Sequence, residues 1–119
     1  KIKEISYIHA EGLAGGELKH GPIALIEPGT PCLVIAPNDE TYNDVLSGAM
    51  ELKARGGLII GIASQANSVF DIHLPVQDWG DASVIAYIVV AHLLAYELSL
   101  ARGLDPDKPR NLAKSVTVK

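Results

Sequence analysis

Two short runs of apolar residues constrain the fold of this chain more than any other feature. Residues 32–36 (CLVIA) and 58–63 (LIIGIA) are apolar at every position apart from Gly61, and Pro37 closes the first run. A continuous apolar run of this length is typical of a strand that a parallel sheet buries on both faces. The two runs therefore predict two neighbouring strands with both faces buried.

The segments around these runs predict helices and a third strand. Residues 39–55 predict a helix that Asn38 or Asp39 caps, that Gly56 and Gly57 terminate, and that turns Leu46, Met50 and Leu52 inward. Residues 71–75 predict a short strand, and residues 82–102 a long buried helix. Alternation of this kind indicates parallel strands joined by right-handed crossovers, which is an α/β fold.

The first 26 residues predict two helical pieces separated by a loop. Ile2, Ile5 and Ile8 follow one another at a spacing of three, which places them on one helical face. Residues 9–16 are rich in glycine and predict a loop, and residues 17–26 predict a short helix that Pro22 divides or restarts. Because no cap precedes the first helical pattern, we interpret residue 1 as an internal position of something longer.

Composition narrows the class of protein. The chain has 119 residues, 48% of them hydrophobic, with a net charge of −4, which suits one small soluble domain and gives no electrostatic reason to expect nucleic acid. Residues 82–101 are long enough to span a membrane, but His92, Glu97 and Ser99 interrupt them, so we predict no membrane partner. The single cysteine, Cys32, predicts a buried thiol and a reducing, cytoplasmic compartment. No spacing suggests a metal site, and no cofactor is predicted.

Three segments together resemble the glucosamine-6-phosphate synthase (glutamine:fructose-6-phosphate aminotransferase, isomerising) family. They are residues 1–11 (KIKEISYIHAE), residues 16–22 (GELKHGP) and residues 107–118 (DKPRNLAKSVTV), the last being the most specific. The resemblance implies the second sugar isomerase (SIS) domain of that enzyme, a flavodoxin-like three-layer domain with a parallel sheet, truncated at its N-terminus. Residues 1–102 would be this partial domain and residues 103–119 a catalytic tail. A strand is then expected to be absent from the chain.

The same resemblance implies the chemistry. In that family two SIS domains convert fructose 6-phosphate and glutamine-derived ammonia into glucosamine 6-phosphate, after a glutaminase domain has released the ammonia. The glutaminase and first SIS domains are not in this sequence, and the phosphate-binding loop belongs to the first SIS domain. The 119 residues alone are therefore expected to be inactive.

Family motifs also assign roles to individual residues. Glu4 corresponds to the base that moves a proton between C1 and C2, with Lys1 beside it as a proton relay. His20 corresponds to the ring-opening histidine, which acts across a homodimer interface, and Lys114 to the lysine that meets the sugar carbonyl. Ala113 would add backbone contacts to the substrate, and Arg110 and Asn111 would hold the tail in place, with Arg110 pairing with a carboxylate such as Glu4.

The residues alone permit plainer interpretations. Glu4 would be a solvated carboxylate on a helix surface, His20 a loop residue and Lys114 an exposed lysine. If Glu4 is catalytic, its neighbours Ile2, Ile5 and Ile8 are expected to raise its pKa. Two other functions stay open: a stand-alone SIS-family sugar-phosphate isomerase or deaminase, and a noncatalytic SIS module that senses a sugar phosphate.

Overall fold

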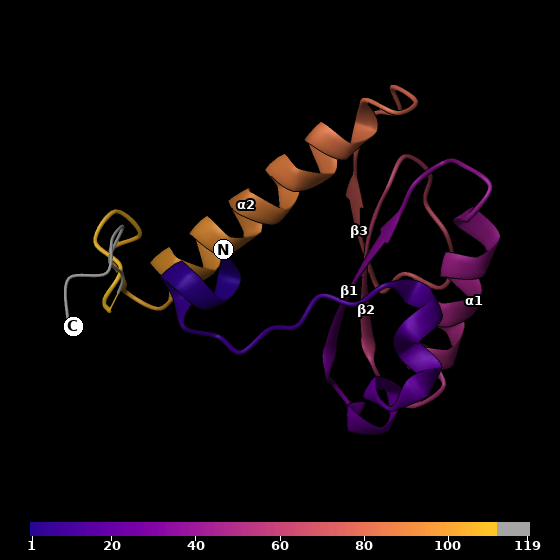
Figure 1. The fold of residues 1–119 in the computed structure, drawn as a ribbon, viewed down its shortest axis with the longest axis horizontal. Helices are drawn as coiled ribbons and strands as arrows, with labels where there is room; N and C mark the ends of the chain where they lie inside the picture. Colours follow the sequence, from indigo (N-terminus) through magenta and orange to yellow (C-terminus); the bar gives the residue numbers. More distant parts are fainter. Residues whose placement is uncertain (112–119) are drawn as a thin grey trace, which may run out of the picture. The chain divides into compact units, whose positions relative to one another are not determined.

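The computed structural model describes residues 1–111, which divide into two compact units (Figure 1). One unit comprises residues 12–90, and the other joins residues 1–11 to the segment that begins at Ala91. The long helix α2, Ser83–Ala101, begins in the first unit and ends in the second. Each unit is described by itself.

A three-stranded parallel sheet forms the centre of the unit of residues 12–90. Its strands are β1 (Pro31–Ala36), β2 (Leu58–Ala63) and β3 (Ile72–Pro75), in the order β1-β2-β3. β1 pairs with β2 from Pro31 opposite Leu58 to Ala36 opposite Ala63, and β2 pairs with β3 from Ile60 opposite Ile72. The predicted α/β class and all three strands are confirmed.

The helix between β1 and β2 is confirmed, with two corrections. Helix α1 spans Tyr42–Lys53 and stops before Gly56, whose φ of 90° favours glycine. No side chain caps its first turn; instead Asp39 accepts hydrogen bonds from the backbone N–H and the hydroxyl of Thr41, which forms a turn ahead of the helix. Met50, predicted to face inward, is 56% exposed, and Ala49 takes the buried position.

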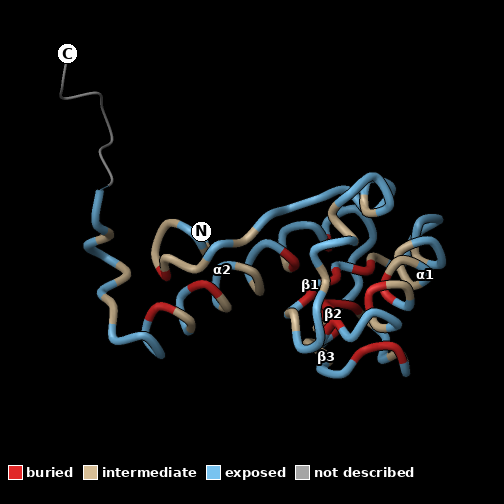
Figure 2. Tube along the Cα trace, turned by 90° about the horizontal axis from the view of Figure 1, so that it is seen from below, coloured by how far each residue is buried: buried red, intermediate tan, exposed pale blue. Residues whose placement is uncertain are grey.

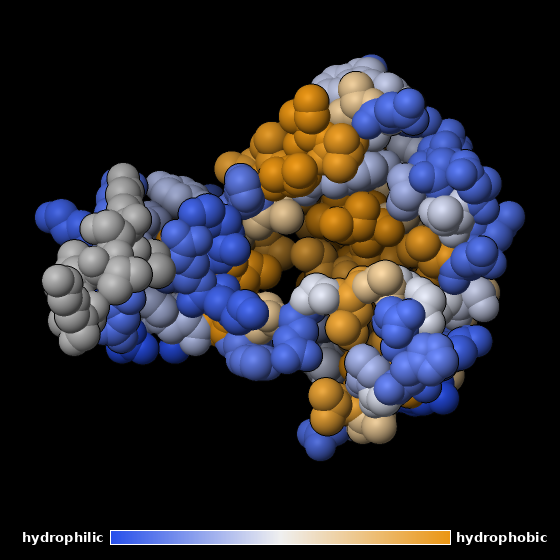
Figure 3. All heavy atoms as spheres, viewed as in Figure 1, coloured by the Kyte–Doolittle hydropathy of each residue, from blue (hydrophilic) through white to orange (hydrophobic). Residues whose placement is uncertain are grey.

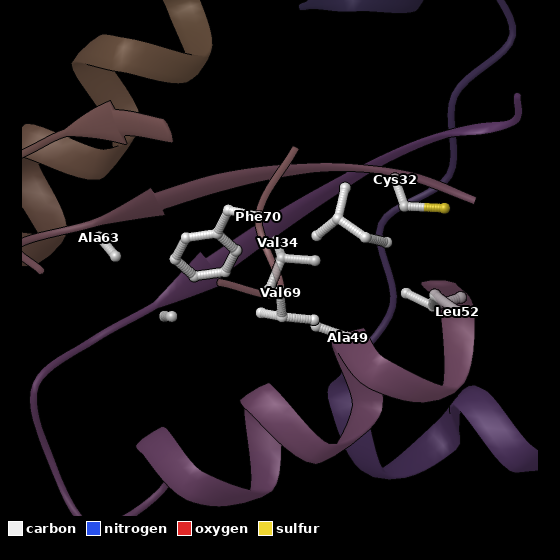
Figure 4. Close-up of a cluster of buried hydrophobic side chains, with 9 residues drawn as sticks. Cys32, Val34, Ala49, Leu52, Ala63, Val69 and Phe70 are labelled. Carbon is white, nitrogen blue, oxygen red and sulfur yellow. The ribbon is translucent and has the colours of Figure 1, made fainter. Parts of the chain in front are cut away.

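The main core lies between α1 and one face of the sheet (Figures 2 and 4). Alternate strand residues Cys32, Val34 and Ala36 point into it with Ile59, and Ala49 and Leu52 enter from the helix. Cys32 is buried as predicted, and burial raises the pKa of its thiol. Phe70 closes this core against Gly61, where a Cβ atom would lie 2.4 Å from the phenyl ring.

The opposite face of the sheet is only partly covered. Ile62 and Leu74 pack there with Tyr87 and Val90 from the beginning of α2, so this unit has helices on both faces of its sheet. Alternate residues of β1 remain open: Leu33 is 36% exposed and Ile35 is 45% exposed. The prediction that β1 is buried on both faces is therefore wrong for this chain, since nothing within residues 12–90 covers that part of the sheet.

The prediction that the long helix is buried is also wrong for the described residues. Its bounds agree with the predicted helix, yet only 17% of its most apolar 18-residue window is buried. The helix is long and apolar enough to span a membrane. One such helix is weak evidence for a membrane protein, because the core helix of a soluble protein can have the same length and composition. The exposed side chains include Val84, Ile85, Ile88 and Val89, and Figure 3 shows apolar side chains gathered over the start of α2 and over the strands.

Candidate active site

The carboxylate of Glu4 lies on a short π-helical turn, Ile2–Ser6. Three polar contacts fix this turn within its unit. The buried Ser6 donates its hydroxyl to the carbonyl of Ile2 at 2.7 Å, Ser99 of α2 donates to the carbonyl of Ile5 at 2.9 Å, and Arg102 donates to the carbonyl of Ser6 at 2.9 Å. Ser99 of α2 and Arg102, which directly follows this helix, thus satisfy carbonyls that a helix end otherwise leaves without partners.

Lys1 and Glu4 form the predicted pair one turn apart. The ammonium of Lys1 lies 2.9 Å from Oε1 of Glu4 and 2.8 Å from Oε2, so it contacts both carboxylate oxygens. The pair is partly open to solvent, with the Glu4 side chain 34% exposed. The ammonium therefore occupies both oxygens through which this carboxylate could accept a proton.

The pKa of Glu4 is lowered, not raised. The hydrogen bond from Lys1 is the main cause, and partial desolvation opposes it. The prediction that Ile2, Ile5 and Ile8 raise this pKa is therefore wrong. Ile2 and Ile5 are half-buried on this turn and Ile8 follows it, but the hydrogen bond from Lys1 has a larger effect on the Glu4 pKa than desolvation.

Glu4 lines an open groove of about 430 Å³ in its unit, together with residues from both ends of the chain. The lining residues are Lys3, Glu4, Tyr7, Ile8, His9, Arg110 and Asn111. The volume is enough for a small sugar-sized ligand. Both predicted tail-holding residues, Arg110 and Asn111, therefore share a groove with the predicted base.

Arg110 makes a different contact from the one predicted. Its guanidinium carbon lies 4.2 Å above the centre of the Tyr7 ring, and its backbone N–H donates to the Tyr7 hydroxyl at 2.7 Å. Within residues 1–111 no ion pair joins Arg110 to Glu4, whose carboxylate oxygens Lys1 already contacts. Sequence reasoning missed Tyr7, because a tyrosine three residues after Glu4 gives no sign that it meets a residue 103 positions away.

The remaining predicted site residues lie in the other unit or outside the described residues. His20 ends the 3₁₀ turn Gly15–His20 in the other unit, where it is exposed and followed by Gly21 at φ 132° and a second turn, Pro22–Leu25. The predicted division of this helical piece at Pro22 is confirmed. Ala113 and Lys114 lie outside the described residues. Within residues 1–111, no cluster of three His, Cys, Asp or Glu side chains is arranged to hold a metal ion.

Comparison with known proteins identifies the family. A family profile described as "SIS domain" matches residues 1–73, which is more than half of the chain. The chain belongs to the SIS-domain family. Within it, the chain is 53% identical over 123 residues to a glutamine–fructose-6-phosphate aminotransferase (isomerising) from Pyrococcus horikoshii, and 50% identical over 121 residues to one from Thermococcus kodakarensis. These alignments cover 99% of this chain and 20% of each relative.

Solved SIS-domain structures agree with the sequence matches. The C-terminal domain of glucosamine-fructose-6-phosphate aminotransferase from Francisella tularensis superposes with a TM-score of 0.81 at 38% identity, covering 91% of this chain and 32% of that one. A glucosamine-6-phosphate deaminase from Thermotoga maritima superposes with a TM-score of 0.70 at 28% identity, covering 97% and 34%. The resemblance to glutamine–fructose-6-phosphate aminotransferases is confirmed over nearly the whole chain, which spans about one fifth of those relatives.

Proposed function

We propose that this SIS-domain chain forms part of the isomerase of a glucosamine-6-phosphate synthase, which converts fructose 6-phosphate and ammonia into glucosamine 6-phosphate. The observation that carries the proposal is the carboxylate of Glu4, paired with Lys1, in a groove that also contains Arg110 and Asn111. The names of relatives about 50% identical to this chain support the choice of reaction.

The proposed chemistry needs a base beside two neighbouring carbons. Ammonia adds to the C2 carbonyl of the open-chain sugar and water leaves, which gives an imine. Glu4 then takes a proton from C1 and returns it to C2, and the proton of the C1 hydroxyl passes to the imine nitrogen, which leaves the aldehyde and the amine of glucosamine 6-phosphate. Sugar hydroxyls that draw the Lys1 ammonium away from Glu4 would raise the carboxylate's pKa and make it a better base.

Other residues complete the proposal. His20 opens the sugar ring, because an imidazole exchanges protons near neutral pH. It acts from the second subunit of a homodimer. Lys114 meets the open-chain sugar at its carbonyl carbon, where an amine can form a Schiff base, and Ala113 adds backbone contacts. Residues 1–102 act as a partial SIS domain and residues 103–119 as its tail. The enzyme is cytoplasmic, and its glutaminase and first SIS domain lie elsewhere in a longer polypeptide. Alone, these 119 residues are inactive.

The test is replacement of Glu4 in the longest natural polypeptide that carries this chain. Glu4→Gln keeps the side-chain shape but removes the base, so we expect glucosamine 6-phosphate formation to fall by about 10²- to 10⁴-fold. Glu11→Gln is the matched control, because Glu11 is 58% exposed and, among the described residues, its ion-pair partner is His9. Turnover that survives Glu4→Gln and Lys114→Ala would instead support a noncatalytic sugar-phosphate sensor.

The similarity to a solved glucosamine-6-phosphate deaminase favours one second candidate, a stand-alone isomerase or deaminase. The two functions differ in their use of glutamine. Formation of glucosamine 6-phosphate that depends on glutamine or on added ammonia supports the synthase. Release of ammonia from glucosamine 6-phosphate, with no synthesis in the other direction, would support the deaminase.

A further inference from the structure

The segment that carries His20 is anchored to the main core by apolar residues on either side of the histidine. Leu18 and Ile26 are partly buried, and both pack against the core between α1 and the sheet. Leu18 lies against Gly48 of α1, since a Cβ atom at Gly48 would be 3.7 Å from Cδ2 of Leu18. His20 itself is exposed. The apolar neighbours therefore fix the segment and leave its histidine open to solvent.

An ion pair forms a further link between this segment and α1 (Figure 1). The ammonium of Lys19 lies 2.9 Å from Oε1 of Glu51, which belongs to α1. Glu51 is the less exposed partner, at 29% against 67% for Lys19. Because Lys19 directly precedes His20, the pair restrains the residue next to the histidine.

The backbone is also constrained directly after His20. Gly21 has φ 132°, a conformation that favours glycine. Its carbonyl accepts a hydrogen bond from the N–H of Ala24 at 2.9 Å, within the turn Pro22–Leu25. His20 is thus flanked by a fixed turn on one side and by the paired Lys19 on the other. The position of the imidazole therefore depends on how firmly Lys19 is held.

We propose that Glu51 is a positioning residue, which holds Lys19 and thereby places His20 for opening the sugar ring. This inference rests on the proposed function, in which His20 performs that step. In ring opening the bond between C2 and the ring oxygen breaks, the ring oxygen gains a proton, and the C2 hydroxyl loses one to become the carbonyl. Glu51 takes part in neither proton transfer. Loss of its carboxylate lowers the fraction of enzyme in which the imidazole is correctly placed.

The first measurement is amide exchange in the longest natural polypeptide that carries this chain. Glu51→Gln removes the charge and keeps the side-chain shape. Exchange across residues 15–20 should accelerate about two- to fivefold, the loss expected for one partly exposed ion pair. Asp44→Asn is the matched control, because Asp44 lies in the first turn of the same helix, about 10 Å from Glu51. The control should leave this exchange unchanged.

Two substrates separate the placement of His20 from general damage to the fold. Fructose 6-phosphate closes its ring through the C5 hydroxyl, whereas 5-deoxyfructose 6-phosphate lacks that hydroxyl and stays open. Glu51→Gln should lower kcat/KM about two- to fivefold for fructose 6-phosphate and leave it unchanged for the open analogue. His20→Asn should show the same pattern with a larger loss. An equal loss on both substrates, or no loss on fructose 6-phosphate, overturns the positioning role of Glu51.

A double-mutant cycle tests whether Glu51 acts through Lys19. The double variant Lys19→Met/Glu51→Gln should accelerate exchange across residues 15–20 no more than the larger of the two single effects, because each single substitution already removes the pair. Effects that add would show that the two residues act separately, and they would also contradict the inference.

Failure of the proposed function has a different signature. In that case the parent polypeptide makes no glucosamine 6-phosphate, or makes it equally well with Glu4→Gln or His20→Asn. Exchange across residues 15–20 needs no turnover, so it reports the pair of Lys19 and Glu51 in either case. Turnover that Glu4→Gln and His20→Asn reduce but Glu51→Gln leaves intact would refute the inference and spare the proposed function.

Discussion

Lys1 controls the protonation of Glu4. The hydrogen bond from Lys1 lowers the Glu4 pKa, so the carboxylate stays ionised to a lower pH than an ordinary glutamate. Because the folded pKa is depressed, the stabilisation from this pair is present above the unfolded pKa and is lost as pH falls through the folded one. The pair therefore shifts the pH at which the proposed base becomes active.

We predict that Lys1→Met raises the Glu4 pKa and moves the acid limb of the kcat/KM profile to higher pH. The measurement is a pH–rate profile of the longest natural polypeptide, supported by carbon NMR titration of the Glu4 carboxyl. Lys3→Met is the matched control, because in residues 1–111 Lys1 is the cation that contacts both carboxylate oxygens. An acid limb that does not move in Lys1→Met would show that another group sets it.

At this scale the sequence predicted the pair of Lys1 and Glu4 but not the contacts of the groove around it. The spacing of Lys1 and Glu4 on a helical turn was sufficient to predict their pair, since residues three apart face each other. It was insufficient for the direction of the Glu4 pKa shift, which depends on whether the hydrogen bond from Lys1 or desolvation has the larger effect. The Tyr7–Arg110 contact depends on a positive φ and a tertiary approach, and neither leaves a local sequence pattern.

At the scale of elements, the apolar runs located β1 and β2 within a residue of their observed bounds. Composition alone did not show that β1 alternates between buried and exposed residues. A uniformly apolar strand has the same sequence whether one face or both are covered, because coverage comes from other elements. Helix α2 shows the same limit, since its apolar sequence predicted burial that the described residues do not supply.

The two faces of β1 provide a direct test. Val34 lies in the core at 9% exposure, and its neighbour Ile35 on the other face is 45% exposed. In the 119-residue chain, Val34→Thr should lower the free energy of unfolding by about 1–3 kcal/mol, because it buries a hydroxyl without an assured partner. Ile35→Thr should change it by no more than about 0.5 kcal/mol. Urea unfolding measures both, and equal costs would contradict the observed alternation.

At the scale of the whole molecule, one face of the sheet is apolar and open. Leu33, Ile35, Leu58 and Ile72 share that face, each at least 36% exposed. Exposed apolar patches of this kind mark surfaces that associate with something else. Because the chain spans one fifth of its relatives, we expect another segment of a longer polypeptide to cover this face.

This expectation predicts different behaviour for the 119 residues and for the longest natural polypeptide that carries them. The 119-residue chain should self-associate as its concentration rises and should bind an apolar dye, because its uncovered sheet face is apolar. The double substitution Ile35→Thr/Ile72→Thr should reduce both effects, as measured by sedimentation and dye fluorescence. In the longest natural polypeptide, Ile35→Thr alone should become destabilising by about 1–3 kcal/mol, because the same side chain is then buried. A cost that stays near zero there would mean that this face remains open, and that the apolar residues of β1 serve a contact between separate molecules.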